Sequence, residues 1–259
     1  MTLKRIISAL FLLVIFLLSF FNSNEIYFSS FALIICLIGM FELNDMLFKY
    51  KHPLFIFLTL LFLIFTFFSL PDPIFIASMS FAFWVFFAPI FIYKNLKLSD
   101  IQKSFFGIFL IACLFYSIIY MYENHRALLL FSFLLVWIAD SGAYFVGRKF
   151  GKHKLVPSIS PGKTIEGAAG ALLLSILFSY LFADYFSLTT KASLFYALII
   201  TFFSIFGDLF ESHLKRGANL KDSGTIIPGH GGVLDRIDGI CSSIPIIFSV
   251  IIFFPNLFL

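Results

Sequence analysis

The 259-residue chain has very few charged side chains. Only 12% of its residues are Asp, Glu, Lys or Arg, while 61% are hydrophobic and the mean hydropathy is +1.02. Soluble globular domains carry about twice this charged fraction. The scarcity of charge therefore excludes a soluble domain and indicates a membrane protein. Alternating segments of about ten residues, which build a transmembrane β-barrel, are also missing, so the predicted class is helical.

Other features that the sequence lacks exclude further classes of protein. The three cysteines are scattered through apolar segments, without the spacing of a disulfide framework or a metal cluster, and we expect them to pack as small core side chains. No basic run interleaved with aromatic residues exists that could bind nucleic acid. No internal repeat is evident, which argues against the inverted-repeat transporters.

Phenylalanine is abundant, with 40 residues, and it lies in long apolar runs. Runs of about 18–20 apolar residues have the length of a membrane-spanning helix. The first run follows Lys4 and Arg5 and resembles a signal peptide, but residues 20–25 offer no small-residue cleavage site. We therefore count it as a helix and predict nine spans, at 6–21, 26–43, 54–70, 74–92, 105–122, 127–147, 165–183, 192–210 and 239–258.

The positions of Lys and Arg predict an orientation. With the N-terminus inside, 16 of the 18 Lys and Arg residues fall in inside segments, and only Arg126 and Lys191 fall outside. Because cytoplasmic loops are enriched in Lys and Arg, the C-terminus is predicted outside and the polar segments 148–164 and 211–238 face the cytoplasm. We predict one integral membrane domain in the plasma (inner) membrane, with scaffold helices in 1–125 and catalytic helices and inside loops in 126–259.

Polar residues are densest between 212 and 238, and Asp208 lies just upstream in an apolar segment. A carboxylate within a membrane helix costs at least about 2.5 kcal/mol, so it needs a wet cavity, a cation or a basic partner. Helical spacing places Ser212 and Lys215 on the face of Asp208. Asp208 is therefore either a cation ligand or an interfacial residue paired with Lys215.

Two more acids follow in the same segment. Asp235 and Asp238 share a face if the chain is helical there, and Asp222 lies nearby. Because Mg²⁺ is bound through a few carboxylates together with substrate phosphates, Asp208, Asp235 and Asp238 are the predicted metal ligands. A solvated acidic loop is the alternative.

The segment also contains groups suited to phosphate. Gly231 and Gly232 allow close backbone approach to a phosphate. Their neighbour His230 could bind phosphate, act as an acid or base, or be purely structural. Four cations could clamp a triphosphate or a lipid phosphate, although inside-loop cations also satisfy the topology rule. They are Lys215, Arg216, Lys221 and Arg236.

A second polar cluster ends the span at 127–147. Helical spacing aligns the intramembrane Asp140 with Tyr144 and Arg148, and Lys149 follows. Residues 161–166 predict a helix start that offers Lys163 and backbone amides to an anion. Thr164 and Glu166 belong to this stretch, which is no P-loop because position 157 is proline.

Glu42 and Asp45 lie at the predicted inside end of the second span. Both are consistent with capping that interface. Glu42 has no assigned role.

Together these motifs resemble the phosphatidate cytidylyltransferase (CDP-diacylglycerol synthase) family. The resemblance covers residues 137–240, shows no departure across the 27 positions from 212 to 238, and extends to the N-terminal spans only by type. It is carried by Asp140, Tyr144, Gly147 and Arg148, by the run from Ser160 to Gly167, and by Ser212, Leu214, Lys215, Arg216, Lys221, Asp222, Gly224, Ile227, Pro228, His230, Gly231, Gly232, Asp235, Arg236 and Asp238.

The resemblance implies a reaction in which phosphatidic acid and CTP give CDP-diacylglycerol and pyrophosphate at the bilayer. It implies Mg²⁺ as a cofactor and metal binding by Asp208, Asp235 and Asp238. A second cation, monovalent such as K⁺, is left open. A homodimer is left open. The expected catalytic residues are Asp208, Asp235, Asp238, Lys215, Arg216, Lys221, Asp222, His230 and Arg236. The expected substrate-binding residues are Ser212, Gly231, Gly232, Asp140, Tyr144, Arg148, Lys149, Lys163, Thr164 and Glu166.

Other functions remain open from the sequence alone. A related cytidylyltransferase or a lipid kinase is the nearest alternative, and a kinase would release CDP rather than pyrophosphate. A cation-coupled transporter that uses Asp140 and Asp208 would show flux without nucleotide. CDP-alcohol phosphotransferases are excluded because their acid-rich Asp-Gly-x2-Ala-Arg helix is absent.

Overall fold

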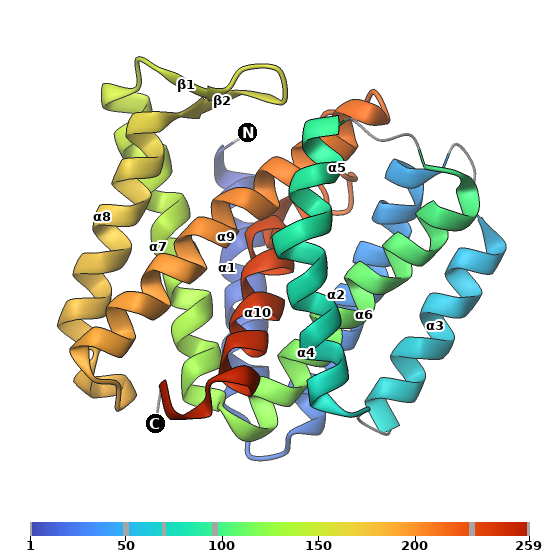
Figure 1. The fold of residues 1–259 in the computed structure, drawn as a ribbon, viewed down its shortest axis with the longest axis horizontal. Coiled ribbons are helices and arrows are strands. Elements are labelled where there is room, and N and C mark those ends of the chain that lie inside the picture. Colours follow the sequence, from blue (N-terminus) through green and yellow to red (C-terminus); the bar gives the residue numbers. More distant parts are fainter. Residues whose placement is uncertain (1, 49–51, 69–70, 95–97, 228–230, 258–259) are drawn as a thin grey trace. The chain divides into compact units, whose positions relative to one another are not determined.

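The structure is a computed structural model that describes residues 2–48, 52–68, 71–94, 98–227 and 231–257, with side chains from residue 7 onward. Within these residues the chain forms helices and one β-hairpin (Figure 1). The helices are α1 (Thr2–Phe20), α2 (Ile26–Leu47), α3 (Pro53–Phe68), α4 (Pro73–Ala82), α5 (Ala88–Lys94), α6 (Asp100–Asn124), α7 (Arg126–Phe150), α8 (Ile165–Phe182), α9 (Thr190–Gly217) and α10 (Leu234–Phe253). The shorter elements are the π-helical η1 (Phe83–Phe87), the 3-10 turns η2 (Asp184–Phe186) and η3 (Pro255–Leu257), and the strands β1 (Lys154–Val156) and β2 (Ser160–Thr164).

The helices confirm the predicted class, a helical polytopic membrane protein. In the described part of the chain, seven helices are long and apolar enough to cross a membrane, α4 to α5 counting as one of 22 residues. The Ile7–Phe20 part of α1 and the helix α3 are apolar but shorter. Each of the nine predicted runs overlaps a helix, with the run 74–92 covering α4, η1 and α5 in turn. The number of spans and their orientation stay predictions.

Two compact units make up the chain, and α9 and α10 contribute residues to both. The first unit contains α1, α2, α3, α6, the end of α9 from Leu214 and the start of α10 to Ile237. The second contains α4, η1, α5, α7, the hairpin, α8, α9 through His213 and α10 from Asp238. The units thus interleave along the chain, and the division into scaffold helices at 1–125 and catalytic helices at 126–259 stays a prediction. The single domain stays a prediction.

Aromatic stacking and one glycine hold the first unit together. The rings of Phe28 and Tyr122 stack with centroids 4.2 Å apart, and the Tyr122 hydroxyl donates to the Phe20 carbonyl at 3.1 Å. On α6, a Cβ added at Gly107 would lie 2.6 Å from a ring carbon of Phe55 on α3. The missing side chain therefore allows α6 to pack closely against its neighbour. Two of the predicted core cysteines, Cys36 and Cys113, are buried in this unit.

Small residues pack α7 against α8 in the second unit, and Figure 1 shows the two helices side by side. A Cβ at Gly142 would lie 2.8 Å from the Gly170 carbonyl oxygen, and one at Gly167 would lie 2.9 Å from the Ala143 carbonyl oxygen. In a membrane, helices associate through such close backbone approach because lipid supplies no hydrophobic force between them. The glycines thus fix the position of the hairpin that joins the pair.

That hairpin corrects the prediction of a helix start at Pro161. Residues Ser160–Thr164 are strand β2, antiparallel to β1 with Lys154 opposite Thr164, and α8 begins only at Ile165. Thr164 has extended dihedral angles, and its hydroxyl accepts from the Gly167 amide at 3.1 Å. A threonine that caps in this way defines the helix start, while Pro161 fits a short strand that has only one partner.

α9 and α10 cross closely in the second unit at Gly207. A Cβ there would lie 2.5 Å from the Asp238 carbonyl oxygen on α10 and would collide with the Ser242 hydroxyl. Gly239 on α10 likewise packs against Ser204 on α9. This crossing brings Asp208, the residue after Gly207, close to Asp238.

We predict that Gly207→Ala destabilises the protein by about 2 kcal/mol, because an added methyl group overpacks the crossing. Activity should fall as well, since α9 must move away from α10. Thermal unfolding in detergent measures the first effect and product formation the second. Gly217→Ala is the matched control, because a Cβ at this position in α9 meets nothing within 4 Å. Equal unfolding temperatures for the two variants would contradict the prediction.

Candidate active site

Four acids of the second unit interact through their charges, and we call them the carboxylate cluster: Asp140 on α7, Asp208 and Glu211 on α9, and Asp238 on α10. The charges of Asp208, Glu211 and Asp140 all act unfavourably on Asp238. Glu211 is buried, Asp208 and Asp238 are half-buried, and Asp140 is exposed. Like charges at close range in an apolar protein repel one another strongly. The cluster is therefore an environment that favours a bound cation.

Lys163 supplies one positive charge to this cluster. Its Nζ lies 2.6 Å from Oδ2 of Asp208 and donates to the Ile205 carbonyl at 3.3 Å. The Ser212 hydroxyl donates to Oδ1 of the same aspartate at 3.3 Å. Strand β2 thus brings a lysine from the upstream polar segment to an acid of the downstream one. Nζ of Lys215, the alternative partner of Asp208, lies 2.7 Å from Oδ1 of Asp235.

The carboxylate cluster supplies the hard oxygen donors that Mg²⁺ prefers. Among the described residues, no three His, Cys, Asp or Glu side chains converge as a ready-made metal-binding group. Mg²⁺ does not need such a group, because it keeps several waters and uses one or two carboxylates together with substrate phosphates. The hard oxygen donors of Asp208 and Asp238 fit that mode of binding.

We predict that Lys163→Met lowers kcat/KM by about 10- to 100-fold, because a hydrogen bond to a charged group contributes about 1.5–3 kcal/mol. Steady-state kinetics with nucleotide and lipid varied in turn would measure the loss. Lys154→Met is the matched control, because Lys154 is exposed on the neighbouring strand, opposite Thr164. An unchanged kcat/KM in Lys163→Met would remove this lysine from the site.

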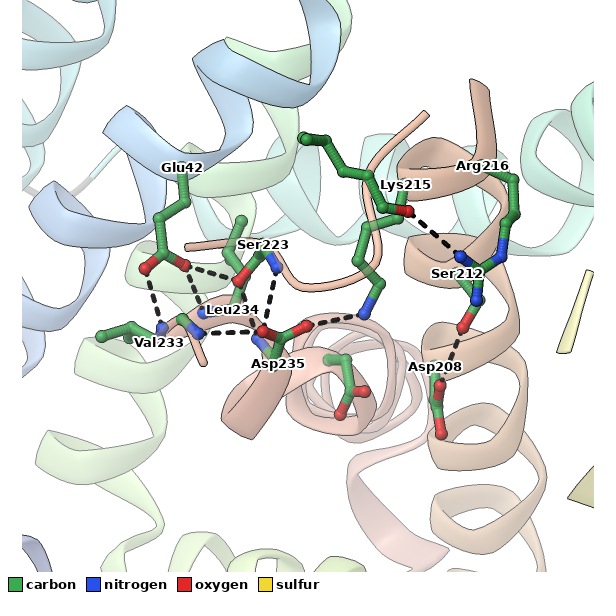
Figure 2. Close-up of polar contacts among 12 residues, drawn as sticks. Glu42, Asp208, Ser212, Lys215, Arg216, Ser223, Val233, Leu234 and Asp235 are labelled. Carbon is green, nitrogen blue, oxygen red and sulfur yellow. Dashed lines mark hydrogen bonds and ion pairs between the residues drawn. The ribbon is translucent and has the colours of Figure 1, made fainter. Parts of the chain in front are cut away.

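Asp235 lies in a separate network within the first unit, shown in Figure 2. Its Oδ1 is 2.7 Å from Nζ of Lys215, and both side chains are about 90% buried, with exposures of 8% and 10%. Its Oδ2 accepts from the backbone amides of Ser223 and Gly232, each at 2.9 Å. The carboxylate thus already neutralises a buried lysine and orders the loop before α10. Its role as a metal ligand stays a prediction.

The glycines before α10 allow the backbone to approach the Asp235 carboxylate closely. Gly231 has a φ of +86°, which favours glycine, and a Cβ there would lie 2.7 Å from Oδ2 of Asp235. We expected the amides of Gly231 and Gly232 to face a phosphate, but the Gly232 amide donates to Asp235. The difference arises because an acid in the first turn of a helix can reach back to the amides before it. His230 lies outside the described residues.

The other predicted cations and acid of this segment are on the surface. Arg216 donates from Nη1 to the Leu220 carbonyl at 3.1 Å. Lys221, Asp222 and Arg236 are exposed. An anionic substrate could therefore reach the two cations, Lys221 and Arg236.

The remaining upstream residues make local contacts. Arg148 donates to the Tyr144 hydroxyl at 2.7 Å, and Lys149 lies over the Phe150 ring. Glu166 accepts from the Lys152 and His153 amides and lies 2.6 Å from Nδ1 of His153. Glu166, in the first turn of α8, therefore holds the segment that follows α7, while Tyr144, Arg148 and Lys149 are exposed.

Sequence reasoning missed two acids that the structure places in these networks. Glu211 belongs to the carboxylate cluster, and its position three residues after Asp208 on one helix face was the available signal. Glu42 is buried in the Asp235 network, at 3% exposure, and no local pattern pointed to it. Glu42 approaches residues about 180 positions later in the chain.

Comparison with known proteins identifies the family of the chain. The chain matches the cytidylyltransferase family over residues 3–254. It belongs to this family. The predicted resemblance is therefore confirmed, and the match extends over the N-terminal spans that resembled the family only by type.

Curated relatives of this cytidylyltransferase-family chain include phosphatidate cytidylyltransferases from bacteria. The protein of that name from Haemophilus influenzae is 45% identical over 133 residues, which cover 49% of this chain and 46% of the relative. The one from Staphylococcus saprophyticus is 45% identical over 134 residues, covering 49% and 51%. The chain thus spans about half the length of the curated relatives that it matches.

Proposed function

We propose that this cytidylyltransferase-family protein transfers the cytidylyl group of CTP to phosphatidic acid, forming CDP-diacylglycerol and pyrophosphate. The observation that carries the proposal is the carboxylate cluster of α7, α9 and α10 with Lys163 paired to Asp208. Acids placed close together in an apolar protein reduce its stability. A reaction between two phosphate-bearing substrates would use them to bind the cations that neutralise the phosphates. The names of the relatives support the substrates.

The chemistry needs no nucleophilic side chain. An oxygen of the lipid phosphate attacks the α-phosphorus of CTP and forms the new bond. The bond from the α-phosphorus to the oxygen bridging it to the β-phosphate breaks, and its electron pair leaves with pyrophosphate. Such transfers depend on positioning and on neutralising charge. We infer that Lys163 and the exposed cations Arg216, Lys221 and Arg236 supply part of that neutralisation.

A divalent cation would supply the rest when bound, by polarising the phosphoryl oxygens. Asp208 and Asp238 are the proposed ligands in the carboxylate cluster, and Asp235 is a third candidate from the sequence pattern. With Mg²⁺ present, Lys163 would be free to exchange Asp208 for a substrate phosphate. We also propose that the protein resides in the plasma membrane with this site facing the cytoplasm, where CTP meets a bilayer lipid.

The test is pyrophosphate release by the purified protein in phosphatidic acid micelles, with CTP, lipid and Mg²⁺ each omitted in turn. The proposal expects release only with all three, together with formation of CDP-diacylglycerol. Release of CDP instead would show a lipid kinase. Cation flux into liposomes without nucleotide turnover would show a transporter.

A further inference from the structure

Glu42 is an acid buried at the end of α2, within the first unit. Its carboxylate accepts three hydrogen bonds, which Figure 2 shows. Oε1 accepts from the Val233 amide at 2.9 Å, and Oε2 accepts from the Leu234 amide at 2.8 Å. Oε2 also accepts from the Ser223 hydroxyl at 2.8 Å. Glu42 therefore binds both the start of α10 and the loop that precedes it.

The contacts of Glu42 suit a carboxylate and no other side chain. The Ser223 hydroxyl accepts a bond from the Asp235 amide at 3.2 Å, so its own proton is directed to Glu42. All three partners are then donors, two of them at the N-terminus of α10, where the helix dipole favours negative charge. A glutamine at position 42 would place its NH₂ group, itself a donor, opposite one of these donors.

The loop is shaped to admit this carboxylate. A Cβ added at Gly224 would lie 2.5 Å from Oε1 of Glu42, and one at Gly232 would lie 2.5 Å from Oε2. Neither glycine needs a positive φ, so the requirement for glycine is spatial. Two glycines of the predicted signature thus leave room for an acid that comes from a helix far away in the sequence.

Glu42 and Asp235 hold the same loop residue. Ser223 donates its hydroxyl to Glu42 and its amide to Asp235, at 2.8 and 2.9 Å. Gly232, whose amide donates to Asp235, is followed directly by Val233 and Leu234, which donate to Glu42. A loss of Glu42 would therefore free Ser223, Val233 and Leu234, which hold Asp235 in the position where it pairs with Lys215.

We propose that Glu42 is a positioning residue for the transfer reaction. Its buried carboxylate anchors Ser223 and the first turn of α10, and it thereby fixes Asp235 and Lys215 without touching substrate. The effect on turnover rests on the proposed function, whereas the anchoring of Ser223 and α10 by Glu42 does not.

The test compares Glu42→Gln with Asp45→Asn by hydrogen exchange and by kinetics. Asp45 is exposed on the same helix, so its variant controls for loss of charge there. In Glu42→Gln, amide exchange of Ser223, Val233 and Leu234 should accelerate by on the order of tenfold or more, because the anchoring acceptor of this segment is lost. Exchange in the cores of α6 and α7 should stay unchanged. At a temperature well below unfolding, kcat should fall by roughly 10- to 100-fold, with KM for CTP changed less than about threefold.

The outcomes separate the two proposals. Faster exchange of the Ser223, Val233 and Leu234 amides with wild-type kcat, or unchanged exchange, would overturn Glu42 as a positioning residue. If wild-type protein releases no pyrophosphate, the proposed function fails, and the exchange experiment then decides alone whether Glu42 anchors the loop. Should the Gln variant not accumulate, Gly224→Ala disturbs the same contact from the loop side. It should accelerate the same amides and lower kcat, and wild-type exchange in that variant would overturn the proposal.

Discussion

Asp238→Asn should abolish turnover while leaving the protein as stable as the wild type, or more stable. The charges of Asp208, Glu211 and Asp140 repel that of Asp238, so removing the charge relieves repulsion in the folded state. If Asp238 helps to hold the cation that polarises the phosphates, its loss removes about 4 kcal/mol of transition-state stabilisation, which is on the order of 1,000-fold in rate. Opposite effects on activity and stability are expected of a functional residue.

The measurements are pyrophosphate release with CTP and phosphatidic acid over a range of Mg²⁺ concentrations, and thermal unfolding in the same detergent. Asp184→Asn is the matched control, because Asp184 is an exposed acid of the same unit outside the cluster. It should change neither quantity. Near-normal turnover in Asp238→Asn would remove this acid from the site, and a lowered unfolding temperature would make it a structural residue.

The helical framework could be predicted because it follows from local composition. A membrane span needs about 20 apolar residues in sequence, and every predicted run overlaps helical structure. The hairpin of β1 and β2 was missed for the same reason. Its strands have only three and five residues, and Pro161 within the second strand resembled a helix start. Short polar strands leave no periodic pattern to read.

The partners of the buried charges could not be predicted, because they come from distant segments. Helical spacing correctly placed Lys215 near the face of Asp208, yet its Nζ lies 2.7 Å from Asp235. Asp208 is held instead by Lys163, a residue on a strand that the sequence did not predict. Glu42 and Ser223 are 181 residues apart. The sequence identifies which residues are acids and cations. Which of them pair depends on close packing between distant segments, which glycines such as Gly207 and Gly224 permit.

Asp235→Asn should abolish turnover and, unlike Asp238→Asn, also destabilise the protein by about 3–5 kcal/mol. The reason is that Asp235 and Lys215 are both about 90% buried at 2.7 Å, and removing one partner leaves the other charge buried without compensation. The amide would also face either Lys215 or the donating amides of Ser223 and Gly232. Thermal and denaturant unfolding, combined with pyrophosphate release, measure the two effects.

A double-mutant cycle with Lys215→Met separates the two roles of Asp235. Each single variant leaves one buried charge, whereas the double variant leaves none, so it should be less destabilised than the sum by about 2–3 kcal/mol. Turnover should nevertheless stay lost in the double variant, because the lost carboxylate is the proposed ligand. If turnover returned with stability, Asp235 would serve only to neutralise Lys215. The proposed metal ligands would then be Asp208 and Asp238 alone. Of the two acids of α10, Asp235 would stabilise the fold and Asp238 would take part in the reaction.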